Sequence, residues 1–193
     1  MRRSLVAVAI SLALGGIAQA APADAGTTPH PPLVRATTQL PRTVVPSHYA
    51  IEVTPHADRL AFDGKVKIDL EVLVPTDRIV LQALGMTFAN STLAAARGKP
   101  MPARVSLDEA AQTATFAFAA PLAPGRYVLS TDYAGTINTQ ANGLFALDYP
   151  TATGKKRALY TQFENSDARR FVPSWDEPNY KATFDLAVNA PAG

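Results

Sequence analysis

Hydrophobic and polar residues alternate with a period of two along much of the chain, most clearly between residues 64 and 75. The apolar positions there are Val66, Ile68, Leu70, Val72 and Val74, and the polar ones are Lys65, Lys67, Asp69 and Glu71. Successive side chains of a β-strand point to opposite faces of the sheet. The alternation therefore predicts a strand with one buried face.

The same alternation recurs in residues 125–134 and 182–188. Shorter segments of similar character, separated by turns rich in Gly, Pro and Asp, are residues 49–53, 78–81, 104–107, 113–118, 143–148 and 158–163. No segment has a helical stripe, although the Ala-rich residues 93–97 can form one turn of helix. Many short strands at this spacing predict an all-β fold, an antiparallel sandwich or a saddle-shaped sheet.

The first 20 residues have the pattern of an export signal. Arg2 and Arg3 precede an apolar run over residues 5–17, and Ala18-Gln19-Ala20 forms an A-x-A cleavage site. The run is too short to span a bilayer. We expect residues 1–20 to be a signal peptide, residues 21–40 a flexible Pro-rich lead-in, and residues 41–193 the folded domain. The protein is then periplasmic or secreted, without a membrane partner after cleavage.

Charge and composition exclude several functions. The chain has 18 Lys plus Arg against 16 Asp plus Glu, a balance that gives no field to attract nucleic acid. It has no cysteine, which excludes thiol catalysis, Cys-ligated metals and disulfides. The 3 histidines form no H-E-x-x-H pair, so we expect neither a metal site nor catalytic residues within this chain.

Two charged clusters have structural interpretations. Asp176 and Glu177 resemble a glycosidase pair, but neighbours in an extended segment point apart, whereas a retaining pair must face one bond about 5 Å from each other. We expect them to bind turn amides or the nearby arginines. The basic run at residues 155–157 is interpreted as a solvated hairpin loop.

The segment from Tyr160 to Glu164 suggests a binding face. In a strand, Tyr160, Gln162 and Glu164 share one face, and an amide beside a carboxylate can bind an ammonium group. The alternative is a structural ion pair of Glu164 with Arg169 or Arg170. Such pairs are common, so the pattern alone favours this alternative.

Longer motifs change that balance. The stretch from Tyr160 to Phe184 contains T-Q-F-E, A-R-R, P-x-W-D-E-P and K-A-T-F in order. With this spacing it resembles the N-terminal domain of the aminopeptidase N family of zinc metallopeptidases. Looser matches at residues 46–49 and 143–145 extend the resemblance over residues 41–193. Ser174, where many members have Cys, and Val172 depart from the pattern at positions that we expect to affect packing.

The resemblance implies a function. Members of the family remove single residues from peptide N-termini, using a zinc ion held in a later catalytic domain. Glu164 matches the N-terminal-domain acid that binds the substrate's α-amine, and Gln162 matches the adjacent residue of the first specificity pocket. We therefore expect peptide substrates with a free N-terminus, a zinc ion bound outside this chain, and no activity of this chain alone.

Two other functions are compatible with the residues. One is a freestanding β-sandwich module that binds peptides or carbohydrates without catalysis. The other is a structural domain that docks against another protein through an exposed apolar patch.

Overall fold

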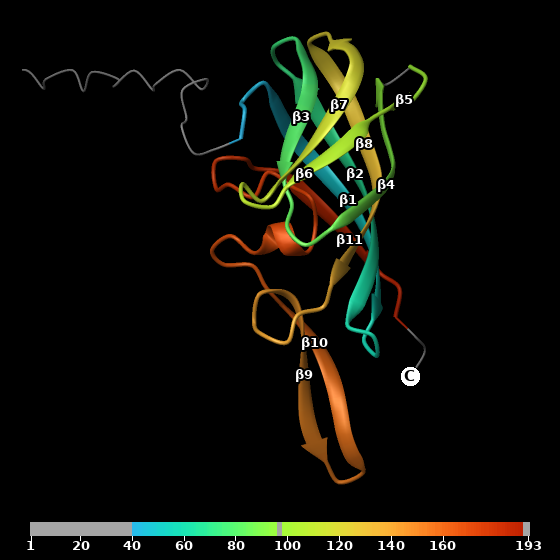
Figure 1. The fold of residues 1–193 in the computed structure, drawn as a ribbon, viewed down its shortest axis with the longest axis vertical. Coiled ribbons are helices and arrows are strands. Elements are labelled where there is room, and N and C mark those ends of the chain that lie inside the picture. Colours follow the sequence, from blue (N-terminus) through green and yellow to red (C-terminus); the bar gives the residue numbers. More distant parts are fainter. Residues whose placement is uncertain (1–39, 96–97, 191–193) are drawn as a thin grey trace, which may run out of the picture. The chain divides into compact units, whose positions relative to one another are not determined.

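Residues 40–95 and 98–190 are described by the computed structural model (Figure 1). In these ranges the regular secondary structure is almost entirely β-strand, as the alternation predicts. The elements are β1 (Val44–His56), β2 (Ala61–Val72), β3 (Thr76–Gln82), β4 (Thr87–Ala95), β5 (Met101–Pro102), β6 (Arg104–Asp108), β7 (Thr113–Leu122), β8 (Gly125–Thr136), β9 (Gly143–Thr151), β10 (Gly154–Gln162), the 3-10 helix η2 (Ala168–Arg170) and β11 (Thr183–Val188).

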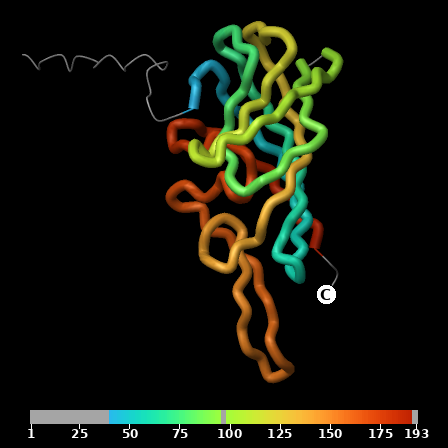
Figure 2. The backbone as a smooth tube through the Cα atoms, in the orientation of Figure 1, coloured from blue at the N-terminus to red at the C-terminus, as the bar shows by residue number. Residues whose placement is uncertain are grey.

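The strands form three sheets within the described residues. The largest has six strands in the order β11-β1-β2-β8-β4-β5, and a three-stranded sheet has the order β3-β7-β6. The third sheet is the hairpin of β9 and β10, which extends away from the other two (Figure 2). All pairs are antiparallel except β1 with β11, which is parallel. The prediction of an all-β fold with antiparallel sheets is confirmed.

The core lies between the two larger sheets. From β2 the side chains of Val66, Ile68, Leu70 and Val72 are buried, which confirms the predicted face. The three-stranded sheet contributes buried residues such as Ile79 and Phe116 to the same cluster. Val74 was expected on this face but lies beyond the end of β2 and is 48% exposed.

Every predicted strand has a counterpart, whereas β4 and β5 are not predicted by the pattern. The expected helical turn at residues 93–97 is wrong, because residues 93–95 continue β4. Leu93 is fully buried opposite Leu129 of β8, so sheet packing overrides the local helix propensity of the alanines. A bulge between Ala89 and Thr92 breaks the alternation there, which hides the strand from a period-two search.

The last strand, β11, is predicted in the correct place but is not covered by other described residues. Its apolar side chains Phe184, Leu186 and Val188 lie in register with Tyr49, Ile51 and Val53 of β1 and are 60%, 57% and 55% exposed. Phe184 stacks on Tyr49 with ring centroids 4.8 Å apart. The parallel pairing with β1 therefore places the strand without a second layer over its apolar face.

The predicted signal peptide and nearly all of the predicted lead-in fall outside the described residues. Leu40, the first described residue, is buried in the core. Within the described ranges, no helix has the length and hydrophobicity needed to cross a membrane.

Candidate functional site

The two predicted site residues lie where the β9–β10 hairpin returns to the larger sheets. Gln162 is the last residue of β10, and Glu164 lies in the turn that follows. The backbone N–H of Glu164 donates to Oε1 of Gln162 at 3.1 Å, and both side chains are exposed. The expectation that Glu164 extends the strand face of Tyr160 and Gln162 is therefore wrong, although the two site residues remain adjacent.

The chain leaves the strand because Phe163 anchors the turn. Its ring packs on Phe171 with centroids 5.3 Å apart. The backbone N–H of Asp167 donates to the carbonyl of Phe163 at 3.0 Å and closes the turn. The Glu164–Asn165 peptide bond is cis. The turn at residues 164–167 thus places the carboxylate of Glu164 at the surface.

The arginines that were candidate partners of Glu164 are paired with other acids. Nε of Arg169 lies 2.9 Å from Oδ2 of Asp176, and Nε of Arg170 lies 2.8 Å from Oδ1 of Asp167. No ion pair of Glu164 is found within the described residues. The structural ion pair favoured by the pattern alone is therefore wrong.

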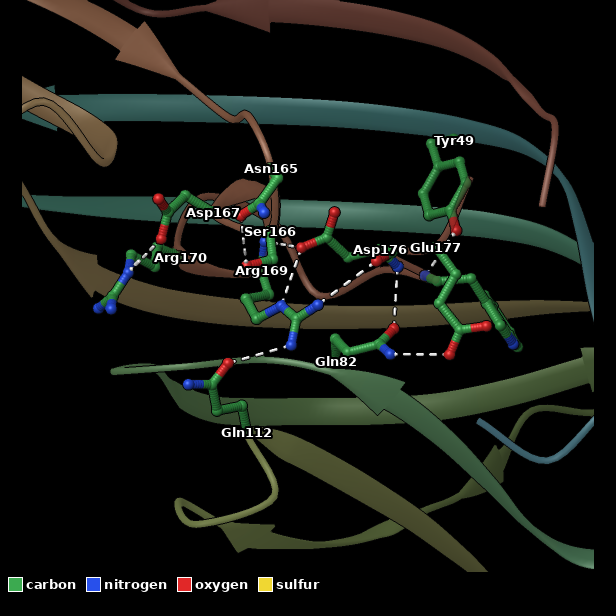
Figure 3. A network of polar contacts seen from close by, with 11 residues as sticks. Tyr49, Gln82, Gln112, Asn165, Ser166, Asp167, Arg169, Arg170, Asp176 and Glu177 are labelled. Atoms are coloured by element: carbon green, nitrogen blue, oxygen red, sulfur yellow. Dashed lines mark hydrogen bonds and ion pairs between the residues drawn. The ribbon is translucent and has the colours of Figure 1, made fainter. Parts of the chain in front are cut away.

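Arg169 is the centre of a partly buried polar network beneath the turn (Figure 3). The side chains of Arg169 and Asp176 are only 14% and 12% exposed. The Arg169 guanidinium also donates to Oε1 of Gln112 at 3.0 Å, and its backbone N–H donates to Asp176 at 3.3 Å. Because η2 carries Arg169, the network holds this helix against the loop between β6 and β7.

The neighbouring acid extends the network to β3. Nε2 of Gln82 donates to Oε1 of Glu177 at 3.1 Å, and the backbone N–H of Asp176 donates to Oε1 of Gln82 at 2.9 Å. The same Glu177 oxygen accepts from the backbone N–H of Leu40 at 2.7 Å. Asp176 and Glu177 thus bind amides and an arginine, as predicted for a structural role. Gln82 was missed, since a single buried Gln in a strand gives no signal for its partner.

Tyr49 connects the same segment to β1. The backbone N–H of Trp175 donates to the Tyr49 hydroxyl at 3.2 Å. Burial raises the pKa of Tyr49, so this hydroxyl stays neutral under ordinary conditions. Beside it, Oγ of Ser174 is buried without a hydrogen-bond partner in the described structure. Residues 174–177 are therefore fixed to both β1 and β3.

The basic run at residues 155–157 belongs to β10 and does not form the predicted hairpin loop. Nε of Arg157 lies 2.6 Å from Oδ1 of Asp148, its cross-strand neighbour. The hydrogen bond from Arg157 lowers the pKa of the Asp148 carboxyl. The strand register places these opposite charges face to face, which a sequence interpretation of the run as a loop cannot anticipate.

A zinc ion has no matching ligand set in the described residues. No group of three or more His, Cys, Asp or Glu side chains converges there. Nδ1 of His48 is 2.8 Å from Thr183 Oγ1, and Nε2 of His56 is 2.8 Å from Asp63 Oδ2.

The site and fold together define an all-β domain that exposes an amide at the end of a strand and a carboxylate in the turn that follows it. Such a domain occurs at the N-terminus of a class of peptidases, and residues 45–193 match the family described as Peptidase M1 N-terminal domain. The chain belongs to this family, which confirms the resemblance seen in its motifs.

Curated relatives are aminopeptidases. Aminopeptidase N of Acetobacter pasteurianus is 40% identical over 158 residues, covering 81% of this chain and 43% of that protein. Aminopeptidase M1-C of Oryza sativa subsp. japonica is 34% identical over 173 residues, covering 89% of this chain and 19% of that protein. The puromycin-sensitive aminopeptidase of Caenorhabditis elegans is 28% identical over 152 residues, covering 78% of this chain and 16% of that protein. The chain spans less than half the length of each.

Proposed function

We propose that this chain is the substrate-binding N-terminal domain of an exported, zinc-dependent aminopeptidase. In this proposal Glu164 binds the free α-amine of a peptide, and Gln162 contacts the first residue. The observation that carries the proposal is that the Glu164 carboxylate is exposed beside Gln162, while Arg169 and Arg170 are paired with other acids. The match to aminopeptidases and to their N-terminal domain family supports it.

The chemistry of the turn suits this role. An exopeptidase must recognise a chain end, and an α-ammonium with a pKa of about 8 is a cationic group that internal peptide bonds lack. A carboxylate forms a charge-assisted hydrogen bond with it, which is stronger than a neutral one. Correct anchoring also positions the first peptide bond for cleavage, so the anchor contributes to catalysis as well as to affinity.

Peptide cleavage itself is assigned to polypeptide outside this chain. The zinc ion would be held there, and we expect this chain alone to be inactive toward peptides. Residues 1–20 carry the pattern of an export signal, which supports a location in the periplasm or outside the cell.

The test replaces Glu164 by alanine in the complete aminopeptidase. Losing a hydrogen bond to a charged group costs about 1.5–3 kcal/mol, which corresponds to a decrease in kcat/KM of about 10-fold to 150-fold. We expect this decrease for unblocked dipeptide substrates, with an unchanged circular dichroism spectrum. The measurement is steady-state kinetics of the variant and the parent enzyme.

Glu71→Ala is the matched control, since Glu71 is an exposed acid on the polar face of β2. It should leave kcat/KM unchanged. Turnover by Glu164→Ala at the parent rate would contradict the assignment of the α-amine site.

A further inference from the structure

Gly143, the first residue of β9, lies directly against the helix η2. Its φ is +63°, a conformation that glycine adopts readily and that residues with a side chain rarely adopt. A Cβ at Gly143 would lie 2.7 Å from Cβ of Arg170 and 3.5 Å from the carbonyl oxygen of Asp167. Because Cβ of Arg170 is bonded to the helix backbone, rotation of that side chain cannot relieve the contact. A side chain at residue 143 would therefore force η2 and β9 apart.

The same glycine lies opposite Gln162, the last residue of β10. Gln162 and η2 are the two ends between which the chain forms the turn that carries Glu164. The turn is tied to both ends. The backbone N–H of Glu164 donates to Oε1 of Gln162 at 3.1 Å, and Asp167 pairs with Arg170 at 2.8 Å (Figure 3). Gly143 thus borders both ends of the turn, and the gap at this residue sets their separation.

Both sides of this gap are anchored. On the side of β9, Nδ2 of Asn138 donates to the carbonyl of Asn142 at 2.9 Å, and the backbone N–H of Asn138 donates to the carbonyl of Leu144 at 2.8 Å. These bonds hold the chain just before and just after Gly143. On the other side, the partly buried polar network holds η2. A substitution that separates β9 from η2 must therefore break some of these contacts or distort the turn that they support.

We propose that Gly143 is a positioning residue for peptide binding. Its missing side chain lets η2 approach β9, and this approach sets the position of the Glu164 carboxylate relative to Gln162. The proposal rests on the proposed function, in which these two residues bind the peptide N-terminus. Widening the 2.7 Å contact to an ordinary one of 3.4 Å requires a movement of about 0.7 Å, whereas a binding site must hold its groups within about 0.5 Å.

The test compares Gly143→Ala with Gly85→Ala in the complete aminopeptidase. Gly85 is the matched control, because its φ is +66° and a Cβ there would meet no atom of the described residues within 4 Å. Both variants place alanine in the same backbone conformation, and only Gly143→Ala adds the contact with η2. We expect Gly143→Ala to lower kcat/KM for unblocked dipeptides by about 10-fold or more, since a misplacement of about 1 Å can cost about 100-fold. Gly85→Ala should retain the parent value, and equal kcat/KM of the two variants would overturn the proposal.

A double variant separates positioning from general destabilisation. Adding Gly143→Ala to Glu164→Ala should not lower kcat/KM further, because a residue that acts through Glu164 has no effect once the carboxylate is removed. The same fold decrease in both backgrounds would show that Gly143 acts on the enzyme by another route, and the positioning role would then be wrong.

Arg170→Gly provides a rescue. It removes the Cβ that the methyl group of Gly143→Ala would meet. Adding Gly143→Ala to Arg170→Gly should therefore leave kcat/KM at the value of Arg170→Gly alone. This comparison also applies if Gly143→Ala by itself does not fold. A further loss in the double variant would show that the contact with η2 is not the cause, which also contradicts the proposal.

Hydrogen exchange distinguishes failure of the positioning role from failure of the proposed function. In the complete enzyme without substrate, backbone amide exchange of residues 163–167 should be faster in Gly143→Ala than in Gly85→Ala. Equal exchange in the two variants would overturn the positioning role. Turnover by Glu164→Ala at the parent rate would instead contradict the α-amine site itself.

Discussion

Two buried tyrosines in the six-stranded sheet differ in how their hydroxyls are satisfied. The Tyr49 hydroxyl accepts a hydrogen bond from the backbone of Trp175. The Tyr133 hydroxyl is buried and has no hydrogen-bond partner among the described residues. Burial raises the pKa of both side chains. The same residue type therefore has opposite consequences for stability at the two positions.

We predict that Tyr133→Phe leaves the free energy of unfolding at pH 7 unchanged or raises it by up to about 1 kcal/mol, because an unpartnered buried hydroxyl is removed. Above about pH 10 the unfolded chain loses the tyrosine proton while the folded chain keeps it. Parent stability therefore falls as pH rises through this range, and the variant should lose less. Urea unfolding at neutral and alkaline pH measures both effects.

Two further variants serve as controls. Tyr149→Phe changes an exposed ring on β9. It should change neither the free energy of unfolding at pH 7 nor the decrease of that free energy at alkaline pH. Tyr49→Phe should lower stability at pH 7 by about 1 kcal/mol, since the Trp175 N–H loses its acceptor. A loss of more than about 1 kcal/mol for Tyr133→Phe would show that its hydroxyl has a stabilising partner.

At the scale of elements, β2 and β8 are joined by glycine–aromatic pairs. Gly64 is opposite Tyr133, and Phe62 is opposite Gly135. A Cβ at Gly64 would lie 2.2 Å from the Tyr133 ring, and one at Gly135 would lie 2.5 Å from the Phe62 ring. Each ring thus occupies the space above a glycine, which lets large side chains pack at the centre of the sheet.

We predict that Gly64→Ala lowers the free energy of unfolding by about 1–3 kcal/mol, because the ring of Tyr133 must move from a packed position. Gly98→Ala is the control, since the nearest atom to its Cβ is 3.4 Å away. Urea unfolding of the two variants checks this. Equal stability of Gly64→Ala and the parent would mean that the sheet accommodates the methyl group without strain.

At the scale of the whole molecule, the polar network connects the core to the surface turn that carries Glu164. Arg169 on η2 is tied through Asp176 to Gln82 of β3, and Gln82 is 6% exposed within the core. The turn that carries Glu164 leads directly into η2. The exposed carboxylate is therefore held by a structure anchored in two sheets, which suits a residue that must bind in one geometry.

We predict that Asp176→Asn destabilises the chain by about 3 kcal/mol, because it leaves the largely buried Arg169 without its counter-charge. In this variant, backbone amide hydrogen exchange of residues 163–170 should be faster than in the parent chain. Asp167→Asn is the control, since the Asp167–Arg170 pair is 26% and 32% exposed and solvent screens it more. The role assigned to the network is contradicted if the two variants accelerate exchange equally.

Local sequence patterns predicted many of the strands of this molecule, its family and the two candidate site residues. The alternation of Val66 to Val72 specified both the strand β2 and its buried face, because the period of two is a property of the extended backbone. The motifs from Tyr160 to Phe184 identified the family that residues 45–193 match. They also singled out Gln162 and Glu164, and their adjacency survives in the structure through a direct hydrogen bond.

Other features depended on partners far away in the chain. Arg169 reaches Gln112 across 57 residues and Asp176 reaches Gln82 across 94. The acids that pair with Arg169 and Arg170 are nearer in the chain, but these long-range contacts fix the positions of Arg169 and Asp176. The pairing of β1 with β11 and the exposure of Leu147, Tyr149 and Tyr160 on the β9–β10 hairpin likewise follow from sheet order. A local pattern sets the direction of each side chain, but strand register and the packing of separate sheets decide which groups meet.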